Sequence, residues 1–584
     1  MTSFDRRAVS DPIANPATSD EAVLASRVRI TAWCLLSLAA LIDMAYGRHA
    51  MNPDGISYLD MGDAMVRGDW KMATNAYWSP LYPWLQGLSL RLFKPSAYSE
   101  FTVVHLVNFP IFLFALAGFD FMLRAAVADR PRVGNIANSG SLLPRWAVFA
   151  VGYSVFLWSA LGIVTMERVS PDMLMAGFIY FAAGLLLRLW AQPRGFWQFA
   201  LLGAVLGFGY LTKAVIFPLS FLFFAIAWVL AGGWRKATPR VLIAVLVFMV
   251  VSGPWFLALS QSKGRVTFGD SRTVAYVALV NGALPLWYFQ DLGTATGHYV
   301  HTVRKIFDAP PIYEFATPIG GTYPVWYDPS YWSEGALPRV TLKGQIAVVK
   351  FWLRYYLSLL FTSQAALLVG FVILYFMAGR DFFRRQVAAR WPLWLIGLAG
   401  LGTYAMVHVE LRYIAVFLTL FWVGLFSGLV MPPGRKGHRL VPVIILVLVI
   451  AMAIPVAFST AGHLREVVKG RSDNQWQVAE DLRAMGVMPG DRVARIGGRF
   501  GHVYWARLLR VVAVADVPEG HAKDFWSATP EVQAEAIKAL RRLGVTAIVA
   551  APDSADKLYI PGPEWQKVGD GTYFALRLAP GSPK

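Results

Sequence analysis

The hydrophobic residues of this chain gather in long runs that short polar segments separate. A helix needs about 20 mainly apolar residues to cross a bilayer, and about eleven runs approach or exceed that length. They lie near residues 30–46, 101–123, 147–165, 171–190, 196–211, 214–231, 240–260, 346–376, 391–408, 412–430 and 440–460. The pattern therefore predicts a polytopic α-helical membrane protein with about eleven transmembrane helices.

One further apolar run, 80–93, is treated differently. It has about 14 residues and opens with two prolines, which makes it too short to span. We expect it to form a helix on the membrane surface. With the N-terminus inside, every predicted cytoplasmic loop is then basic, as the positive-inside rule requires. The basic residues of these loops are Arg124, Arg130, Arg132, Arg145, Arg188, Arg194, Arg235, Lys236, Arg240, Arg380, Arg384, Arg385, Arg390, Arg435, Lys436 and Arg439.

Composition agrees with this class. Of the 584 residues, 56% are hydrophobic and only 15% are charged, and the mean hydropathy is +0.47. The net charge of +18 would suggest a nucleic-acid partner in a soluble protein, but here membrane topology explains it. Cys34 is the single cysteine, so neither a disulfide framework nor a thiolate metal site is expected.

The spans divide the chain into three parts. Residues 1–27 are polar and aperiodic and predict a disordered cytoplasmic tail. Residues 28–460 form the predicted transmembrane part, with outer loops at 47–100 and 261–345; its first run is interpreted as an uncleaved signal anchor, with a cleaved signal peptide as the alternative. Residues 461–584 alternate helix-like and strand-like periods and predict a small extracytoplasmic α/β domain.

Four acidic residues occur together just after the first apolar run, in the stretch Met51–Trp84: Asp54, Asp60, Asp63 and Asp69. A helix is expected from about Gly55. On a helical wheel Asp60, Asp63 and Arg67 share one face and the apolar residues share the opposite one, which predicts a helix lying on the membrane surface. All the bulky outer segments then lie on one side of the membrane.

The chemistry that this side can support is restricted. It has no supply of nucleotide-activated substrates, and the chain has no phosphate-binding loop of the P-loop or Rossmann type. A sugar donor would have to be carried by a lipid, such as a polyprenyl phosphate. Its leaving group is already a phosphate, so the site needs a cation for that charge and a carboxylate base for the acceptor hydroxyl.

The anchor, the outer acidic loop with surface helices, the Pro-rich WSPLYPWL segment and the basic loop after the next span resemble the GT-C superfamily. The resemblance is strongest to the branch of protein O-mannosyltransferases and lipid A aminoarabinose transferases. It covers about residues 28–460 and implies a glycosyltransferase, hexosyl or pentosyl and inverting, in the plasma (inner) membrane. It also implies that the carboxylate early in the first outer loop, here Asp54 of NPDGISYLD, is catalytic.

The acidic loop leaves alternatives open. Asp54 follows Pro53 and could instead be a helix N-cap. Asp60 and Asp63 are possible substrate-binding residues, but a solvated face with an ordinary Asp63–Arg67 ion pair is the more common arrangement. The loop has no DxD metal signature, and the nearest spacing is Asp60-x-x-Asp63. We therefore predict no cofactor and no metal, although the resemblance leaves a divalent cation possible.

Three further segments carry candidate residues. In TMERVSPDML, the cap residue Ser170, the first-turn proline Pro171 and the first-turn acid Asp172 predict the start of a helix. Capping does not explain Glu167. The resemblance makes Glu167 a second catalytic acid that orients the acceptor, with Arg168 as a possible substrate contact.

Lys213 lies between two apolar runs, where a buried charge is a functional candidate unless it snorkels to the interface. In HVELRYI, Glu410 and Arg412 could simply pair with other protein groups, but the planar guanidinium of Arg412 could bind a lipid phosphate in a bidentate manner. We predict that Lys213 and Arg412 bind the donor phosphate, and that Glu410 is a possible substrate contact.

The outer segment 261–345 is aromatic, with LWYFQD at 286–291 and PIGGTYPVWYDPSYWSEG at 318–335. Tyr327 and Asp328 are possible sugar contacts, although an interfacial aromatic belt is the more common explanation. His298 and His301 have a chelating spacing but no partnered acids nearby. A transporter or lipid flippase is the alternative function; against it, no internal symmetry is visible in the sequence.

Overall fold

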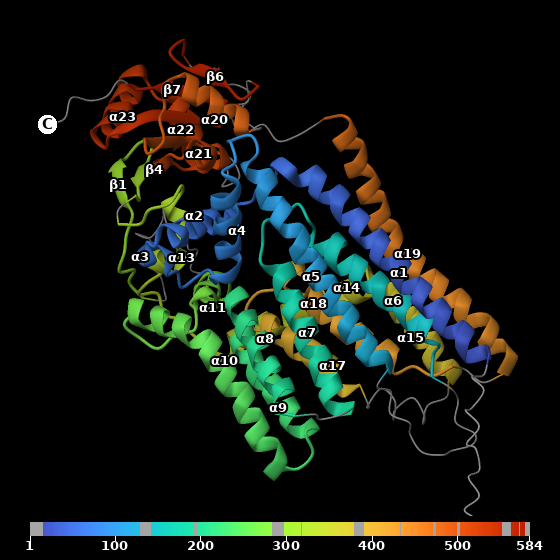
Figure 1. Cartoon of the computed structure of the whole chain (residues 1–584). Coiled ribbons are helices and arrows are strands. Elements are labelled where there is room, and N and C mark those ends of the chain that lie inside the picture. Colours follow the sequence, from blue (N-terminus) through green and yellow to red (C-terminus); the bar gives the residue numbers. More distant parts are fainter. Residues whose placement is uncertain are drawn as a thin grey trace, which may run out of the picture.

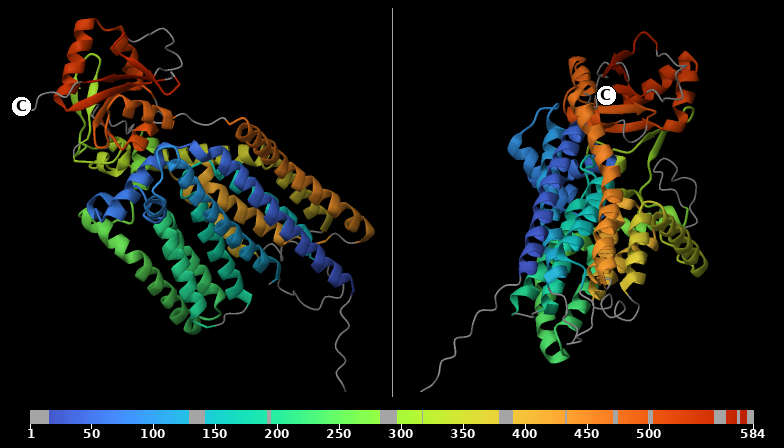
Figure 2. Two further views of the ribbon diagram at one scale, coloured as in Figure 1. Left: turned by 45° about the horizontal axis from the view of Figure 1, so that its top comes forward. Right: turned by 90° about the vertical axis from the view of Figure 1, so that its right-hand side faces the viewer.

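A computed structural model describes residues 16–128, 142–191, 195–282, 297–316, 318–378, 390–431, 434–470, 475–498, 503–551, 562–570 and 573–578. Long helices lie side by side in a tilted bundle, and a β-sheet covers one end of it (Figure 1; Figure 2). We call this end the sheet end of the bundle. Much of the predicted basic loops, including Arg130, Arg132, Arg194 and Arg380–Arg385, and the LWYFQD segment lie outside the described residues.

Six helices are long and apolar enough to cross a membrane, and a seventh span results if α14 and α15, which meet at 73°, count as one. The six are α1 (Pro16–Tyr46), α5 (Glu100–Ala128), α6 (Arg145–Leu157) with η2 (Trp158–Val164), α7 (Asp172–Ala191), α10 (Trp234–Ser262) and α19 (Gly434–Val468). The bent pair is α14 (Leu342–Phe361) and α15 (Ala365–Ala378).

Shorter helices occupy the remaining predicted runs. They are α8 (Trp197–Thr212), α9 (Ile216–Leu230), α17 (Trp391–Ala405) and α18 (Leu411–Ser427). Each predicted apolar run thus coincides with a helix or with the bent pair, and the count of about eleven transmembrane helices stays a prediction. The first helix begins at Pro16, so the expectation of an irregular tail through residue 27 is wrong for its second half.

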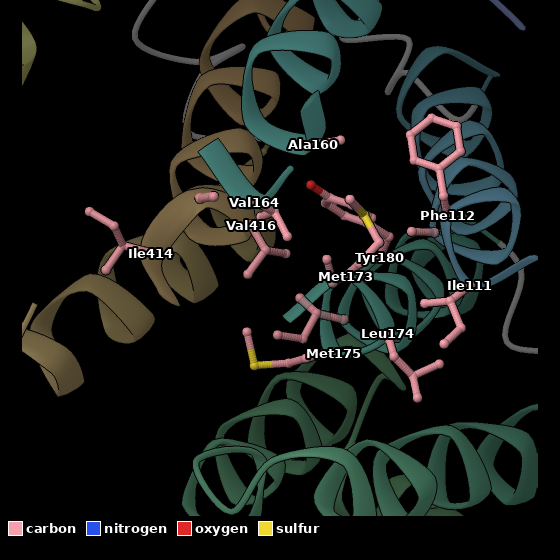
Figure 3. Packing of buried hydrophobic residues seen from close by; sticks show 14 of the residues in the cluster. Ile111, Phe112, Ala160, Val164, Met173, Leu174, Met175, Tyr180, Ile414 and Val416 are labelled. Atoms are coloured by element: carbon pink, nitrogen blue, oxygen red, sulfur yellow. The ribbon is translucent and has the colours of Figure 1, made fainter. Parts of the chain in front are cut away.

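The centre of the bundle is a dry core formed by α5, α6, η2, α7 and α18. Figure 3 shows Phe112 of α5, Tyr180 of α7 and Val416 of α18 converging there, and all three are almost fully buried. Without a hydrophobic driving force in lipid, such close interhelical packing holds spans together. This core fixes the ends of α7 and α18, which carry residues of the site described below.

Short helices cover the sheet end. They are η1 (Gly47–His49), α2 (Pro53–Arg67), α3 (Trp70–Ala73), α4 (Leu81–Phe93), α11 (Ser271–Ala275), η3 (Tyr276–Val280), α12 (Pro324–Tyr327) and α13 (Pro329–Trp332). The helix α4 exposes Trp84, Leu88 and Leu92, and its place on the membrane surface stays a prediction. The prediction for α2 is wrong: it does not lie on the membrane with a solvated acidic face, because residues Gly55 to Gly62 are all buried.

The sheet has seven strands in the order β1-β2-β4-β3-β5-β7-β6. They are β1 (Arg304–Phe307), β2 (Ile312–Glu314), β3 (Arg492–Ile496), β4 (Val512–Val517), β5 (Val545–Ala550), β6 (Gln566–Val568) and β7 (Tyr573–Arg577). The central strands β4, β3 and β5 are parallel, and the outer pairs are antiparallel. Around them are α20 (Gln475–Ala484), α21 (Tyr504–Leu509), η6 (Glu519–His521), α22 (Ala522–Ser527) and α23 (Pro530–Arg542). Because β1 and β2 come from the outer loop 261–345, the sheet extends beyond the predicted C-terminal segment.

Candidate active site

Four helix termini meet at the sheet end of the bundle and carry charged side chains. Asp54 lies in the first turn of α2, Asp172 begins α7, Lys213 caps the C-terminus of α8, and Arg412 lies in the first turn of α18. The helix termini bring these charged side chains together at one end of the bundle, while the helix bodies pack their apolar surfaces. Residues far apart in the sequence thereby form one charged cluster.

Arg412 is the centre of this cluster. Its guanidinium donates to Asp54 Oδ2 at 3.1 Å and to Glu410 Oε2 at 2.7 Å, and its Nε lies 3.8 Å from Asp172 Oδ2. Only 10% of the Arg412 side chain is exposed. Charge-assisted hydrogen bonds are strong in such partly dehydrated surroundings, and the planar fork of arginine can hold two oxygens at once.

Lys213 adds a second cation beside Arg412. Its ammonium donates to Asp172 Oδ1 and lies 3.6 Å from the centre of the Tyr413 ring. The guanidinium of Arg412 lies 5.0 Å from the same ring centre and donates to the Tyr413 hydroxyl at 3.2 Å. Lys213 therefore points into the protein rather than snorkelling to the interface, and Tyr413 holds both cations on one side of the cluster.

The surroundings of Glu410 favour its ionised form. Burial alone would raise its pKa, but the hydrogen bond from His408 and the charge of Arg412 outweigh burial and lower the pKa of Glu410 to about 2. Asp54, Asp172 and Glu410 thus supply three carboxylates against two cations.

Aromatic side chains cover Asp54. The indole of Trp326 in α12 donates to Asp54 Oδ1 at 3.2 Å, and Ser57 donates to the Trp326 carbonyl at 2.9 Å. Tyr77 and Trp78 pack against Trp326, with ring centres 6.2 and 6.1 Å away. Burial raises the pKa of Tyr77, so its hydroxyl stays protonated. Trp326 thus packs beside Asp54 and forms one side of the charged cluster.

The N-cap alternative for Asp54 is wrong. Asn52 occupies the N-cap of α2, and its amide side chain exchanges hydrogen bonds with the backbone of Val169 at 3.2 and 2.8 Å. This pairing attaches the start of α2 to the loop before α7. The carboxylate of Asp54 therefore accepts its side-chain hydrogen bonds from Trp326 and Arg412.

Glu167 belongs to a different group. Its carboxylate lies 3.3 Å from Nε2 of His463, whose Nδ1 contacts Asp43 Oδ1 at 3.0 Å, and the His463 ring stacks on Tyr46. These contacts link the loop before α7 to α1 and α19. Among the contacts of the described residues, none joins Glu167 to Asp54 or Arg412. Arg168 is exposed and makes no ion pair within the described part of the chain.

Asp60 and Asp63 face a buried arginine. Arg507 of α21 contacts Asp60 Oδ1 at 2.7 Å, Asp63 Oδ2 at 2.8 Å and Glu100 Oε1 at 2.8 Å, and Asp60 also accepts from Thr322. The predicted Asp63–Arg67 pair is wrong, because Asp63 binds Arg507 and Arg510 instead. For Asp60 and Asp63 the predicted solvated face is also wrong, because α21 covers these two residues.

Tyr327 and Asp328 likewise have internal partners. Tyr327 is buried and donates to the Met72 carbonyl at 2.5 Å, while Asp328 caps α13 through the backbone and hydroxyl of Ser330. Burial raises the pKa of Asp328. Both side chains therefore hold the outer loop on α3 and α13.

The sequence reasoning missed Asp172, Trp326 and Tyr413 as members of the site. Asp172 was explained as an ordinary first-turn acid, yet its Oδ2 is buried without a hydrogen bond in the described structure. An acid in the first turn of one apolar run, together with ELRY at the start of the sixth apolar run after it, is the signal that could have suggested the pair. In the described residues, no group of three or more His, Cys, Asp or Glu is arranged to hold a metal ion.

No protein-family model matches this chain, and no curated protein does. Solved structures similar to it include ArnT from Cupriavidus metallidurans bound to undecaprenyl phosphate, with 15% identity over 96% of this chain and 99% of that one and a TM-score of 0.41. The apo state of that ArnT gives 16% identity, coverage of 95% and 100%, and a TM-score of 0.40. The Archaeoglobus fulgidus oligosaccharyltransferase in complex with Zn and sulfate gives 12% identity, coverage of 88% and 67%, and a TM-score of 0.44.

Proposed function

We propose that this protein is a membrane glycosyltransferase that moves one sugar from a polyprenyl-phosphate donor to an acceptor hydroxyl. One observation carries the proposal: Asp54 shares the guanidinium of Arg412 within a cluster that also holds Lys213, at the sheet end of the bundle. A carboxylate next to two cations supplies a base and a phosphate site in the same place.

The donor phosphate would bind Arg412 and Lys213. Its oxygens would take the place of Asp54 on the guanidinium, because Asp172 is buried and Glu410 is bound more closely. Binding of the donor therefore releases Asp54 from its ion pair. The freed carboxylate keeps its hydrogen bond from Trp326, which holds it in place.

The reaction would be a single displacement. The acceptor oxygen attacks the anomeric carbon, Asp54 takes the hydroxyl proton, and the bond from the anomeric carbon to the phosphate oxygen breaks. The electron pair of that bond stays on the phosphate, where Arg412 and Lys213 stabilise the added charge. One displacement inverts the anomeric configuration. The faces of Trp326 and Tyr77 suit the apolar side of a sugar ring.

The predicted basic loops support a cytoplasmic N-terminus and a sheet end on the outer face of the plasma membrane. The acceptor, whether lipid, glycan or protein, would then be met outside the cell. A predicted role of Glu167 in orienting the acceptor would be indirect, since Glu167 contacts His463 and not the cluster around Arg412.

The test uses the full-length protein in membranes and measures transfer of labelled sugar from a polyprenyl-phosphate donor to membrane acceptors. Removal of a general base costs about 10²–10⁴-fold in rate, so Asp54→Asn should lose transfer on that scale. The purified Asp54→Asn protein should still bind undecaprenyl phosphate in native mass spectrometry. Arg412→Gln should lose both transfer and binding, because it removes the phosphate contact.

Asp69→Asn is the matched control. Asp69 lies in the same acidic segment but is exposed and only caps α3, so its variant should transfer sugar at the wild-type rate. Full transfer by Asp54→Asn would overturn the proposal. Movement of the labelled lipid across proteoliposomes without any sugar transfer would instead support the flippase.

A further inference from the structure

A polar pocket lies on the sheet end, apart from the Arg412 cluster. It has a volume of about 330 Å³ and opens where α2, α4 and the end of α21 meet, elements that lie together in Figure 1. Its lining residues are Asp63, Val66, Arg67, Gly87, Leu90, Arg91 and Arg510. Three arginines and one acid thus face one cavity.

The pocket has unbalanced positive charge. Asp63 is already paired with Arg507 at 2.8 Å and with Arg510 at 2.9 Å. Arg67 and Arg91 are exposed, and neither makes an ion pair with any residue that the structure describes. Arg91 only reaches the Val66 carbonyl, at 3.4 Å. Two guanidinium groups are therefore available for an anion, whereas Arg510 is already paired with Asp63 and Glu100.

An apolar strip borders the same pocket. Trp84, Leu88 and Leu92 follow one another at four-residue spacing along α4, and their side chains are 46%, 45% and 73% exposed. Residues spaced in this way share one face of a helix. Arg91 lies directly beside Leu88 and Leu92 on that face. A surface helix of this kind lies in the membrane interface with its apolar strip among acyl chains and its cations at headgroup level.

We propose that this pocket binds the phosphate headgroup of an anionic membrane lipid. Arg67 and Arg91 contact the phosphate oxygens, and the acyl chains lie along Leu88 and Leu92. Two guanidinium groups suit a phosphate, and the exposed apolar surface next to them suits acyl chains. The combination fits a lipid rather than a free anion. The site is independent of the proposed transferase activity, because it shares no residue with the Arg412 cluster.

The experiment titrates the purified full-length protein with phosphatidylglycerol or phosphatidylcholine and counts bound lipid by native mass spectrometry. Hydrogen bonds to charged groups contribute enough for about a tenfold change in affinity each. The double variant Arg67→Gln, Arg91→Gln should bind phosphatidylglycerol at least about tenfold more weakly than the wild type. Phosphatidylcholine should bind both proteins weakly and equally.

Two controls separate this site from general lipid attraction. Arg272→Gln changes an exposed arginine of α11 outside the pocket and should bind phosphatidylglycerol like the wild type. Leu92→Ser should weaken lipid binding without removing a charge. The proposal is overturned if the double variant keeps wild-type affinity, or if Arg272→Gln loses as much. It is also overturned if inorganic phosphate displaces the lipid at equal concentration, which would indicate a free-anion site.

Discussion

The charged residues at the sheet end differ in the number of ion-pair partners that they have. Arg412 is held by three carboxylates, and loss of any one of them would leave two partners on a guanidinium that stays charged. Glu167 has a single ion-pair partner, His463. The same histidine ring also contacts a second acid, Asp43. The two acids predicted to be catalytic, Asp54 and Glu167, thus differ in their surroundings.

The surroundings of Glu167 give a prediction for pH. Burial raises its pKa, nearby His463 opposes that rise, and Asp43 adds to it. A carboxyl whose pKa is higher in the folded than in the unfolded protein stabilises the fold at low pH, and this contribution is lost as pH rises through the folded value. Ionised Glu167 is therefore costly at neutral pH. Glu167→Gln should equal or exceed the wild type in melting temperature at pH 8, and the difference should shrink towards pH 5.

The measurement is thermal unfolding in detergent at a fixed scan rate across that pH range. A melting temperature of Glu167→Gln that falls most at pH 8 would contradict the prediction, because it would mean that the His463 ion pair outweighs burial. Sugar transfer by the same variant tests the predicted catalytic role separately. A stable variant without transfer would support that role, whereas a stable variant with full transfer would remove it.

At the scale of elements, α2 and α4 depend on two glycines that let their backbones touch. A Cβ on Gly87 would lie 2.4 Å from the Gly62 carbonyl oxygen, and a Cβ on Gly62 would lie 2.4 Å from the Pro83 oxygen. Backbone atoms cannot move aside as a flexible side chain can. The pair therefore sets the distance between the helix that carries Asp54 and the helix that borders the arginine pocket.

Gly87→Ala should destabilise the protein by about 1–3 kcal/mol, the usual cost of overpacking. The separation of α2 from α4 should also lower sugar transfer, since Asp54 shifts relative to Arg412. Gly402→Ala is the control: Gly402 is an exposed position in α17 where a Cβ meets nothing within 4 Å, so alanine should be neutral or slightly stabilising. Thermal unfolding of both variants checks this, and equal melting temperatures would show that the contact is not tight.

Hydropathy predicted most elements of the bundle, because a lipid environment leaves helices as almost the only way to satisfy the backbone. It could not predict the surroundings of α2. The acidic face of that helix looks solvated in the sequence, but its partner Arg507 lies 447 residues from Asp60. Nor could it reveal that Asp172 joins Lys213, since an acid in a first helical turn is already explained by local capping. Long-range charge pairs of this kind have no local pattern.

At the scale of the whole molecule, two features join the sheet to the bundle. One is the outer loop, which contributes strands to the sheet, and the other is a set of buried ion pairs. The outer loop supplies β1 and β2 to the sheet and Trp326 to the site, so the sheet and Asp54 are connected through one segment. The buried Arg507 adds a second connection, since its side chain is 2% exposed and bridges α21 to α2 and α5. The predicted boundary near residue 460 missed both connections, because β-pairing between distant strands is not visible as a composition change.

Arg507 gives the prediction at this scale. Breaking a buried ion pair by removing one partner costs about 3–5 kcal/mol, because the remaining charges stay buried without compensation. Arg507→Met leaves Asp60 buried without a cation and leaves Glu100 with Arg510 as its remaining cation, so it should lower the melting temperature and make the sheet more sensitive to limited proteolysis. Arg304→Gln, which breaks an exposed pair on β1, should cost at most about 1 kcal/mol.

A triple variant distinguishes lost charge balance from lost packing. Adding Asp60→Asn and Glu100→Gln to Arg507→Met removes the buried charges that Arg507 neutralises, so part of the lost stability should return. If charge is the cause, the triple variant is more stable than Arg507→Met alone, and its sheet again resists protease. If the triple variant is no more stable than the single one, the arginine acts through its packing and its hydrogen-bond geometry. The attachment of the sheet would then not depend on the buried ion network.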